Sequence, residues 1–217
     1  MNQETNFEKD FIKSYIDFVL TEGKEPTSVY AFAKNLQSSE QEFYQHFSSF
    51  DHLKSTIWKN WLMSTLTQIA EDPNYEGFSA REKVLMFYFA FFENLKANRS
   101  YALFYAKEIF SPLKNEIHLH DFKKDFNAYI KNVLKDGEES TEIATRPYIS
   151  DKYVHVFYPK FMYLLHFWYA DTSSNFEKTD ALIEKIVNLT FDLISNNAID
   201  SLFDLGKFII QNQKFRF

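Results

Sequence analysis

The sequence predicts an all-α protein, and three observations support that prediction. Apolar residues recur at helical spacing along nearly the whole chain. Among 217 residues there are 25 Phe and 13 Tyr but only four Gly and five Pro, which favours long regular elements with few tight turns. The apolar share of 45% is ample for a buried core at this length.

Composition also excludes several classes of protein. The chain has no cysteine, so disulfides, thiolate metal sites and cysteine nucleophiles are excluded, and a reducing, cytoplasmic setting is expected. Residues 1–9 are polar and acidic, unlike a secretory signal, and no apolar stretch approaches the length of about 18 residues that a membrane span needs. A net charge of −6 weighs against a protein that coats nucleic acid, but it allows one local basic face.

The N-terminal segment predicts three helices. The first covers residues 5–21, and Gly23 ends it as a C-cap. Glu25-Pro26 forces an extended link, after which the Thr27 hydroxyl is expected to cap a helix over residues 28–36. The third helix covers residues 40–46.

Residues 27–53 are typical of a helix-turn-helix. Gln37-Ser38 interrupts the helical spacing, and Ser39 with Glu42 makes a capping box for the second helix of the pair. Ser48 or Ser49 then caps a long helix over about residues 49–72, which ends at Asp72-Pro73.

These motifs carry a family resemblance. Thr27-Ser-Val, the Phe32-Ala33 pair, and Phe43-Tyr-Gln-His-Phe47 followed by Ser-x-x-x-Leu53 resemble the DNA-binding half of a TetR-family transcriptional regulator. The resemblance implies a TetR-like, all-α fold. A three-helix DNA-binding domain over residues 1–50 would be joined by the helix at about 49–72 to a helical ligand-binding and dimerisation domain within residues 51–217.

The remaining helices are predicted from periodicity and punctuation. Ser79-Ala-Arg-Glu82 is a capping box that opens a buried helix ending near Ala97. Further helices are expected over residues 101–110, 115–135, 152–170, 178–196 and 199–211, with breaks at Pro112, Gly137, the loop 138–150 and the turn 171–175. The order of these helices, without a further motif, is similar to TetR architecture.

The resemblance implies that the second short helix enters the major groove of operator DNA. Tyr44 and His46 match phosphate-contacting positions, whereas Phe43 and Phe47 are expected to fill the core. The DNA-binding candidates are Thr27, Ser39, Gln41, Glu42, Tyr44, Gln45 and His46.

Several positions depart from the family pattern. Phe50 stands where a Lys is common, Glu40 stands where Lys or Arg often opens the recognition helix, and Glu42 replaces a small or hydroxyl residue. Gln37 replaces the usual Gly of the turn and must tolerate its backbone angle. Residues 1–60 contain six Lys and no Arg against nine acids. Two interpretations therefore remain, a DNA-binding domain and a degenerate helix-turn-helix that serves packing or protein contact.

The aromatic middle of the chain suggests a pocket for an apolar small molecule or lipid, with hydroxyls at one polar end. The alternative is a filled core. A pocket without DNA binding would make the chain a lipid- or apolar-ligand-binding protein. The ligand-binding candidates are Phe87, Tyr88, Phe91, Tyr101, Phe104, Tyr105, Phe122, Phe126, Tyr129, Tyr158, Met162, His166 and Tyr169.

In proteins with this architecture the last two long helices usually form a four-helix dimer interface, so the resemblance implies a homodimer. The interface candidates are Phe157, Phe161, Leu164, Leu165, Trp168, Leu182, Ile186, Leu189 and Leu193. The alternative is that they fill the core of one subunit. The amphipathic helix over residues 199–211 is expected to pack on the body of the domain rather than on a membrane.

The sequence offers little support for an enzyme, a metal site or a cofactor. Its four scattered glycines form no phosphate-cradling loop. His118 and His120 are two residues apart, which puts them on different faces of a helix and disfavours a metal site. His155 and His166 lie on a strongly apolar helix, where a core position is favoured over a ligand contact.

Overall fold

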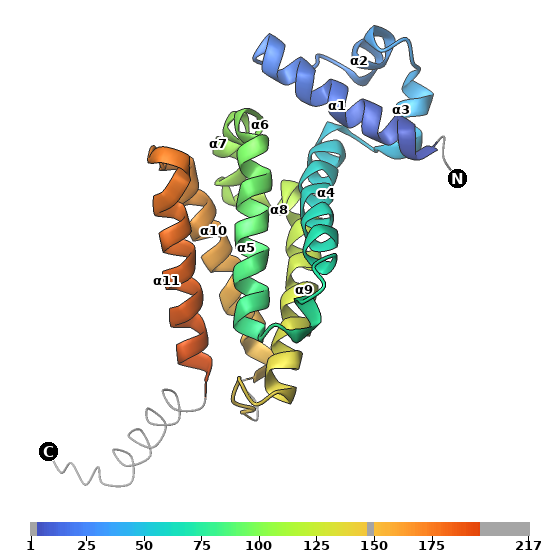
Figure 1. Ribbon diagram of the computed structural model, residues 1–217. Coiled ribbons are helices and arrows are strands. Elements are labelled where there is room, and N and C mark those ends of the chain that lie inside the picture. The colour runs from blue at the N-terminus through green and yellow to red at the C-terminus, as the bar shows by residue number, and fades with distance from the viewer. Residues whose placement is uncertain (1–3, 147–149, 196–217) are drawn as a thin grey trace, which may run out of the picture. The chain divides into compact units, whose positions relative to one another are not determined.

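The computed structural model describes residues 4–146 and 150–195, and within these ranges every regular element is a helix, so the all-α prediction is confirmed. Figure 1 labels the helices along the chain. The helices are α1 (Glu4–Glu22), α2 (Val29–Asn35), α3 (Glu40–His46), α4 (Phe50–Ala70), α5 (Ala80–Ala97), α6 (Arg99–Phe104), α7 (Ala106–Ile109), α8 (Pro112–His118), α9 (His120–Glu139), α10 (Val154–Ala170) and α11 (Glu177–Ile194). Short 3-10 turns are η1 (Tyr75–Gly77), η2 (Ser150–Lys152) and η3 (Ser174–Phe176). None of the described helices has the length and apolarity needed to cross a membrane.

The chain forms two compact units. The first contains residues 1–67 and 91–125, and the second contains residues 68–90 and 126–217. The first unit therefore holds α1 to α3, most of α4, and α6 to α8. The second holds α10 and α11, and α5 and α9 contribute to both. The predicted domain boundary near residue 50 stays a prediction.

Aromatic rings form the core of the first unit around α1 to α3. Phe11 meets Phe43 edge to face at 5.5 Å between ring centroids, and Phe32 meets Phe43 at 6.3 Å. Further along α4, Trp58 contacts Phe122 at 6.2 Å, and Phe91 contacts the same ring at 5.4 Å. Burial of Phe11, Phe32 and Phe43 fixes α1, α2 and α3 to one another.

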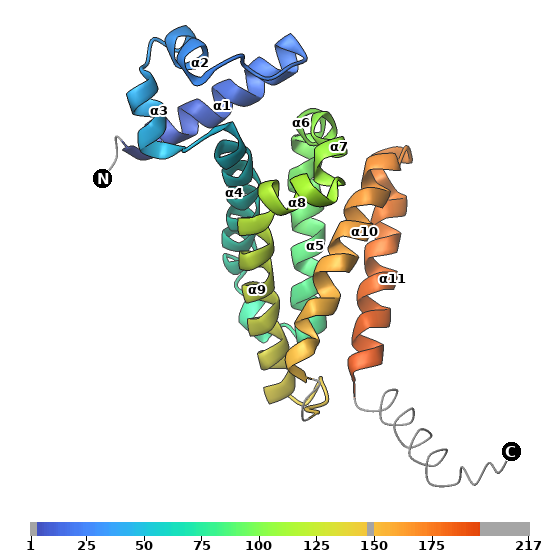
Figure 2. The same cartoon turned by 180° about the vertical axis from the view of Figure 1, so that it is seen from behind.

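In the second unit, α10 and α11 run side by side, as both views in Figures 1 and 2 show. Phe157 of α10 packs on Phe191 of α11 at 6.1 Å between centroids. Phe126 of α9 packs on Phe87 of α5 at 5.6 Å and on Phe161 of α10 at 5.5 Å. The buried faces of four helices therefore meet in one aromatic core.

Several predicted caps are confirmed. Gly23 follows α1 with a left-handed φ of 64°. The Ser49 hydroxyl accepts a hydrogen bond from the His52 amide at the start of α4, and Ser79 and Glu82 form the capping box of α5. The cap of α2 was predicted one residue too early, because α2 begins at Val29 and the Ser28 hydroxyl, not that of Thr27, accepts from the Ala31 amide.

Other helix boundaries were predicted wrongly. The expected helix over 101–110 is split at Tyr105 into α6 and α7. The break predicted at Pro112 is present, since α7 ends at Ile109, and Pro112 itself opens α8 because proline at the first helical position loses no hydrogen bond. Gly137 lies inside α9 and does not end it. The predicted helix over 199–211 lies outside the described residues.

Candidate functional site

The core of the first unit fixes which face of α3 is available. Phe43 and Phe47 are buried against α1 and α2, as expected of core residues. Gln41, Tyr44 and Gln45 lie on the outer side of the same helix, and 52% of Tyr44 is exposed. The helix-turn-helix thus presents a polar and aromatic face on its second helix.

The turn before α3 uses Glu42 internally. The Ser39 hydroxyl accepts from the Glu42 amide at 3.1 Å, which caps the helix. The Glu42 carboxylate accepts from the Ser38 hydroxyl at 2.5 Å, and its side chain is half-buried. This carboxylate is therefore held within the turn.

Gln37 adopts a left-handed backbone conformation. Its φ is 55°, at the position where the resembling family usually has glycine. A side chain there costs about 1 kcal/mol or more relative to glycine, because Cβ approaches the following carbonyl. The turn keeps its geometry without the residue best suited to it.

The other DNA-binding candidates are placed as follows. Thr27 and Ser39 are exposed, and Ser39 serves as the α3 N-cap. His46 is half-buried, with its ring 6.4 Å from that of Phe11. Their contact with DNA stays a prediction.

Phe50, which replaces a common lysine, is half-buried and packs on the core of the first unit. Its ring stacks on Tyr15 at 5.4 Å and meets Phe32 edge to face at 5.6 Å. The position therefore contributes to packing between α1, α2 and α4, which a lysine could not do.

Lys54, one of the six lysines of the N-terminal segment, is buried. Lys54 is only 3% exposed, and its ammonium contacts Glu25 at 2.7 Å, Asp51 at 2.8 Å and Glu108 at 3.6 Å. Sequence reasoning missed this role, although Lys54 lies between Leu53 and Ile57 on the buried side of α4. That apolar setting was the available signal.

The ligand-binding candidates fall into two ring clusters, one in each unit. In the first unit, Tyr101 packs on Tyr105 at 5.0 Å, and Phe104 packs on Tyr105 at 4.9 Å. In the second unit, Phe87 packs on Tyr129 at 5.1 Å, and Tyr158 stacks on Phe161 at 6.2 Å. Within each unit these rings form a packed aromatic interior.

Two tyrosine hydroxyls of the second unit differ in their partners. Tyr129 donates to the Lys83 carbonyl at 3.0 Å and accepts from Tyr75 at 3.2 Å. The Tyr88 hydroxyl is fully buried and has no hydrogen-bond partner among the described residues. Burial raises the pKa of Tyr88 far above its ordinary value, so this hydroxyl remains protonated. An unpaired buried hydroxyl costs about 1–3 kcal/mol.

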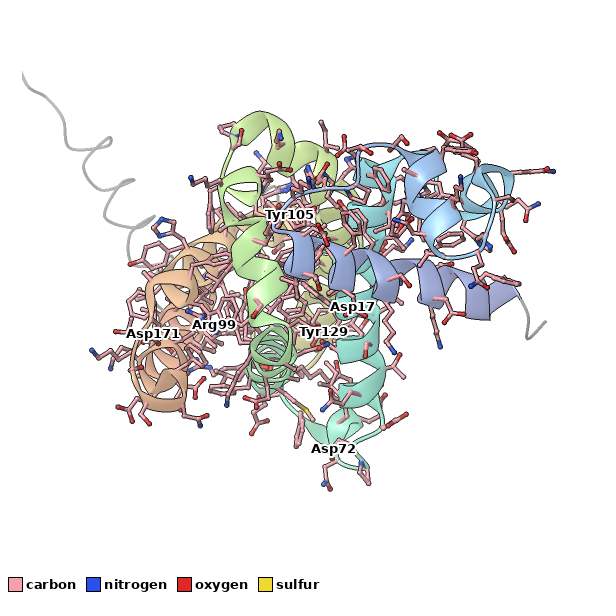
Figure 3. The ribbon with its side chains drawn as sticks, turned by 90° about the horizontal axis from the view of Figure 1, so that it is seen from above. Asp17, Asp72, Arg99, Tyr105, Tyr129 and Asp171 are labelled. Atoms are coloured by element: carbon pink, nitrogen blue, oxygen red, sulfur yellow. The ribbon has the colours of Figure 1, made fainter. Side chains whose placement is uncertain are left out.

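A groove in the first unit lies among residues that the sequence did not single out. It has a volume of about 680 Å³, an apolar floor of Ile12, Ile16 and Trp61, and a rim that includes Lys13 and Asp17. Figure 3 labels Asp17 on α1. The rim carries charges of both signs.

The fold agrees with a comparison with protein families. The model of the tetracyclin repressor-like C-terminal domain matches residues 83–209. The chain belongs to the TetR family. A comparison with curated proteins finds no match to this chain. The match covers the C-terminal region, so it identifies the family independently of the helix-turn-helix motif.

In this TetR-family chain the interface candidates separate into two groups. The α10 residues Phe157, Phe161, Leu164, Leu165 and Trp168 are all buried within one chain. The α11 residues behave differently: Leu182 and Ile186 are half-buried, and Leu189 and Leu193 are 59% and 42% exposed. The accessible part of the predicted interface therefore lies on α11.

The two histidines of α10 are not core residues. His155 and His166 are both exposed, although a core position was favoured for them. Successive turns of α10 bury Phe157, Phe161 and Leu164, and the two histidines lie on the opposite side of this helix. Met162, Tyr158 and Tyr169 are half-buried.

Proposed function

We propose that this TetR-family protein is a dimeric transcriptional regulator whose operator binding is controlled by an apolar ligand. The observation that supports it best is the exposed face of α3, which carries Gln41, Tyr44 and Gln45 on a helix fixed by core phenylalanines. Two such helices in a dimer would read half-sites about 34–36 Å apart. An amide side chain can hydrogen-bond the edge of an adenine in the major groove.

The ligand part of the proposal is supported by Tyr88. Its buried hydroxyl lacks a partner among the described residues, and apolar rings such as Phe87 and Phe126 pack around it. A largely apolar ligand with one hydrogen-bonding group would satisfy this hydroxyl. The ligand would act by changing the separation or angle of the two recognition helices.

Operator binding is tested by a fluorescence-anisotropy titration with DNA from the gene's own upstream region, at 50 to 200 mM salt. We expect Gln45→Ala to weaken binding by about 1–3 kcal/mol, because it removes one base contact. Gln68→Ala, at an exposed position of α4, is the matched control. A folded protein that fails to bind this DNA even near 50 mM salt would contradict the regulator.

Ligand binding is tested by native mass spectrometry of the purified protein. An adduct that survives desalting is expected, and Tyr88→Phe should lower its occupancy because the hydrogen bond is lost. Tyr15→Phe is the control, because its hydroxyl is already paired with Tyr105 at 2.7 Å. Protein that is always free of adduct would count against the pocket.

The burial of Lys54 favours a second function, that of an apolar-ligand-binding protein that does not bind DNA. Residues 1–60 have no arginine, Lys54 is neutralised by carboxylates and Lys59 is half-buried, which leaves Lys9, Lys13, Lys24 and Lys34 as the lysines of this segment that are exposed. Since non-specific affinity for DNA comes from phosphate neutralisation, this surface is weakly anchored. An apolar-ligand-binding protein without DNA binding would give an adduct in mass spectrometry and no anisotropy change at any salt.

A further inference from the structure

The cluster around Lys54 joins three separate segments of the first unit. Lys54 lies in the second turn of α4, Glu25 lies in the link before α2, and Glu108 lies on α7. The Lys54 ammonium contacts one carboxylate in each segment: Asp51 in α4, Glu25 in the link and Glu108 in α7. Tyr105 adds a hydrogen bond from its hydroxyl to Glu25 at 3.1 Å, and the Lys54 ammonium lies 5.2 Å from the centre of its ring.

His118 extends this cluster onto α8. Its side chain is only 2% exposed, and Nε2 lies 3.2 Å from Glu108 Oε2 and 3.9 Å from Asp51 Oδ1. The other Glu108 oxygen pairs with Lys114 at 2.8 Å. His118 therefore faces the cations Lys54 and Lys114 and the carboxylates Glu108 and Asp51.

Glu108 Oε2 lies close to both His118 and Lys54. This oxygen is buried and accepts no hydrogen bond from the described residues, although His118 Nε2 lies at 3.2 Å and Lys54 Nζ at 3.6 Å. A proton on His118 would add a second buried cation at this oxygen. It would attract Glu108 and repel Lys54, and thereby weaken the contact between α4 and α7.

We infer that this cluster is a proton-sensitive joint: protonation of His118 loosens the contacts that hold the Glu25 link and the start of α4 to α7 and α8. The joint itself is a property of the first unit. Its consequence for operator binding rests on the proposed function, because the Glu25 link and α4 flank the helix-turn-helix.

The direction follows from the environment of His118. Burial and the nearby Lys54 charge lower the pKa of His118, and the opposing attraction of Glu108 and Asp51 does not restore it. In the open, hydrated state the pKa would be near 6.5. The open state therefore binds the proton more tightly, so opening is favoured as pH falls below about 6.5. At pH 5.5 the population of the open state should rise by up to about tenfold.

Hydrogen exchange measures the joint directly. Exchange of the full chain is followed by mass spectrometry at pH 7.5, 6.5 and 5.5, with each peptide normalised to its chemical exchange rate. From pH 7.5 to 5.5 we expect up to about tenfold loss of protection in residues 19–28 and 105–120, and no such loss in residues 160–190.

The decisive comparison is with His118→Gln, which is neutral at every pH and should keep its protection in acid. His155→Gln, at an exposed position of α10, should behave like the wild type. In case His118→Gln folds poorly, the histidine resonances of the wild type are titrated by NMR. One of them should titrate at lower pH than the others, at the acid end of the range over which protection is lost. Protection that is independent of pH in the wild type, or equally pH-dependent in His118→Gln, would overturn the joint.

An operator titration over the same pH range separates the joint from the proposed function. Pronounced loss of protection in acid without DNA binding at any pH would retain the joint and reject the regulator. Operator binding with pH-independent protection would retain the regulator and reject the joint.

Discussion

At the scale of single residues, the buried carboxylate of Asp171 ties together the turn before α11 through hydrogen bonds. Asp171, labelled in Figure 3, lies in the turn between α10 and α11. Its Oδ1 accepts from the Ser173 amide and hydroxyl at 2.8 and 2.6 Å, and its Oδ2 accepts from the Thr179 amide and hydroxyl at 2.9 and 2.6 Å. Burial alone would raise the pKa of this carboxyl, but the four hydrogen bonds lower it to about 2.

Asp171→Asn should therefore destabilise the chain in a pH-dependent way. Because the folded pKa of about 2 lies below the ordinary 3.8, the charged carboxylate stabilises the fold fully above about pH 4. We expect a loss of roughly 2 kcal/mol at pH 7, measured as the free energy of unfolding in urea. The difference between wild type and variant should shrink as pH falls from 4 to 2. A difference that stays constant over this range would show that the charge is not responsible.

Gln37→Gly should increase the stability of the fold, whereas Asp171→Asn should decrease it. Gln37→Gly removes a Cβ from a backbone with φ 55°, and the relief outweighs the extra freedom of glycine in the unfolded chain. Thermal unfolding should show a gain of up to about 1 kcal/mol. Gln41→Gly is the matched control, because Gln41 is helical and exposed, and should cost about 1 kcal/mol. If Gln37→Gly loses stability as Gln41→Gly does, the turn is not strained.

At the scale of elements, the helices that the sequence predicted best are those whose ends are set by local chemistry. The starts of α3 and α5 depend on Ser39 and on the Ser79–Glu82 pair, both within one turn of the helix. Gly137 was wrongly predicted to end its helix, because the requirement for glycine there comes from residues outside that helix. A Cβ there would lie 2.8 Å from the Cβ of Ala80, which is on a helix distant in the sequence. Glycine in α9 permits close helix packing rather than a helix end.

Local sequence patterns likewise predicted the exposed face of α3 but not the contacts between residues that are distant in the sequence. The outward residues of α3 follow from helical spacing and one motif, so Tyr44 and Gln45 could be placed from the sequence. The distant partners of Lys54 come from the link before α2 and from α7, His118 of α8 contacts one of these partners, and only the fold brings Glu25, Glu108 and His118 together. Likewise, spacing alone could not tell the buried side of α10 from its exposed side, so His166 was assigned to the wrong one.

Gly137→Ala tests the close packing of α9. The added methyl group would also lie 2.6 Å from Ile143 Cδ1, and Ala80 can move only with the backbone of α5. We expect destabilisation of about 1–3 kcal/mol despite the better helix propensity of alanine. Gly77→Ala, where no atom lies within 4 Å of the new Cβ, should be nearly neutral. Adding Ala80→Gly should recover part of the loss, and an unchanged stability of Gly137→Ala would contradict the packing argument.

At the scale of the whole molecule, two features bear on the proposed function. Residues 1–60 are net acidic although they contain the helix-turn-helix. On α11, Leu182, Ile186, Leu189 and Leu193 form an apolar stripe at helical spacing that one chain leaves partly uncovered. Since the proposed regulator must place two recognition helices on one operator, the stripe is the feature on which its function most depends.

The last prediction therefore concerns dimerisation through α11. The double change Leu189→Glu and Leu193→Glu would bring two carboxylates from each chain into a desolvated interface, where they would be unpaired. We expect the variant to sediment as a monomer in analytical ultracentrifugation at a concentration where the wild type is a dimer, with its helical circular dichroism retained because both side chains are accessible in one chain. Leu20→Glu, at a position of α1 that is also 42% exposed, should leave the dimer intact. If the double variant remains as dimeric as the wild type, α11 does not form the interface, and the separation of the recognition helices must be set by another surface.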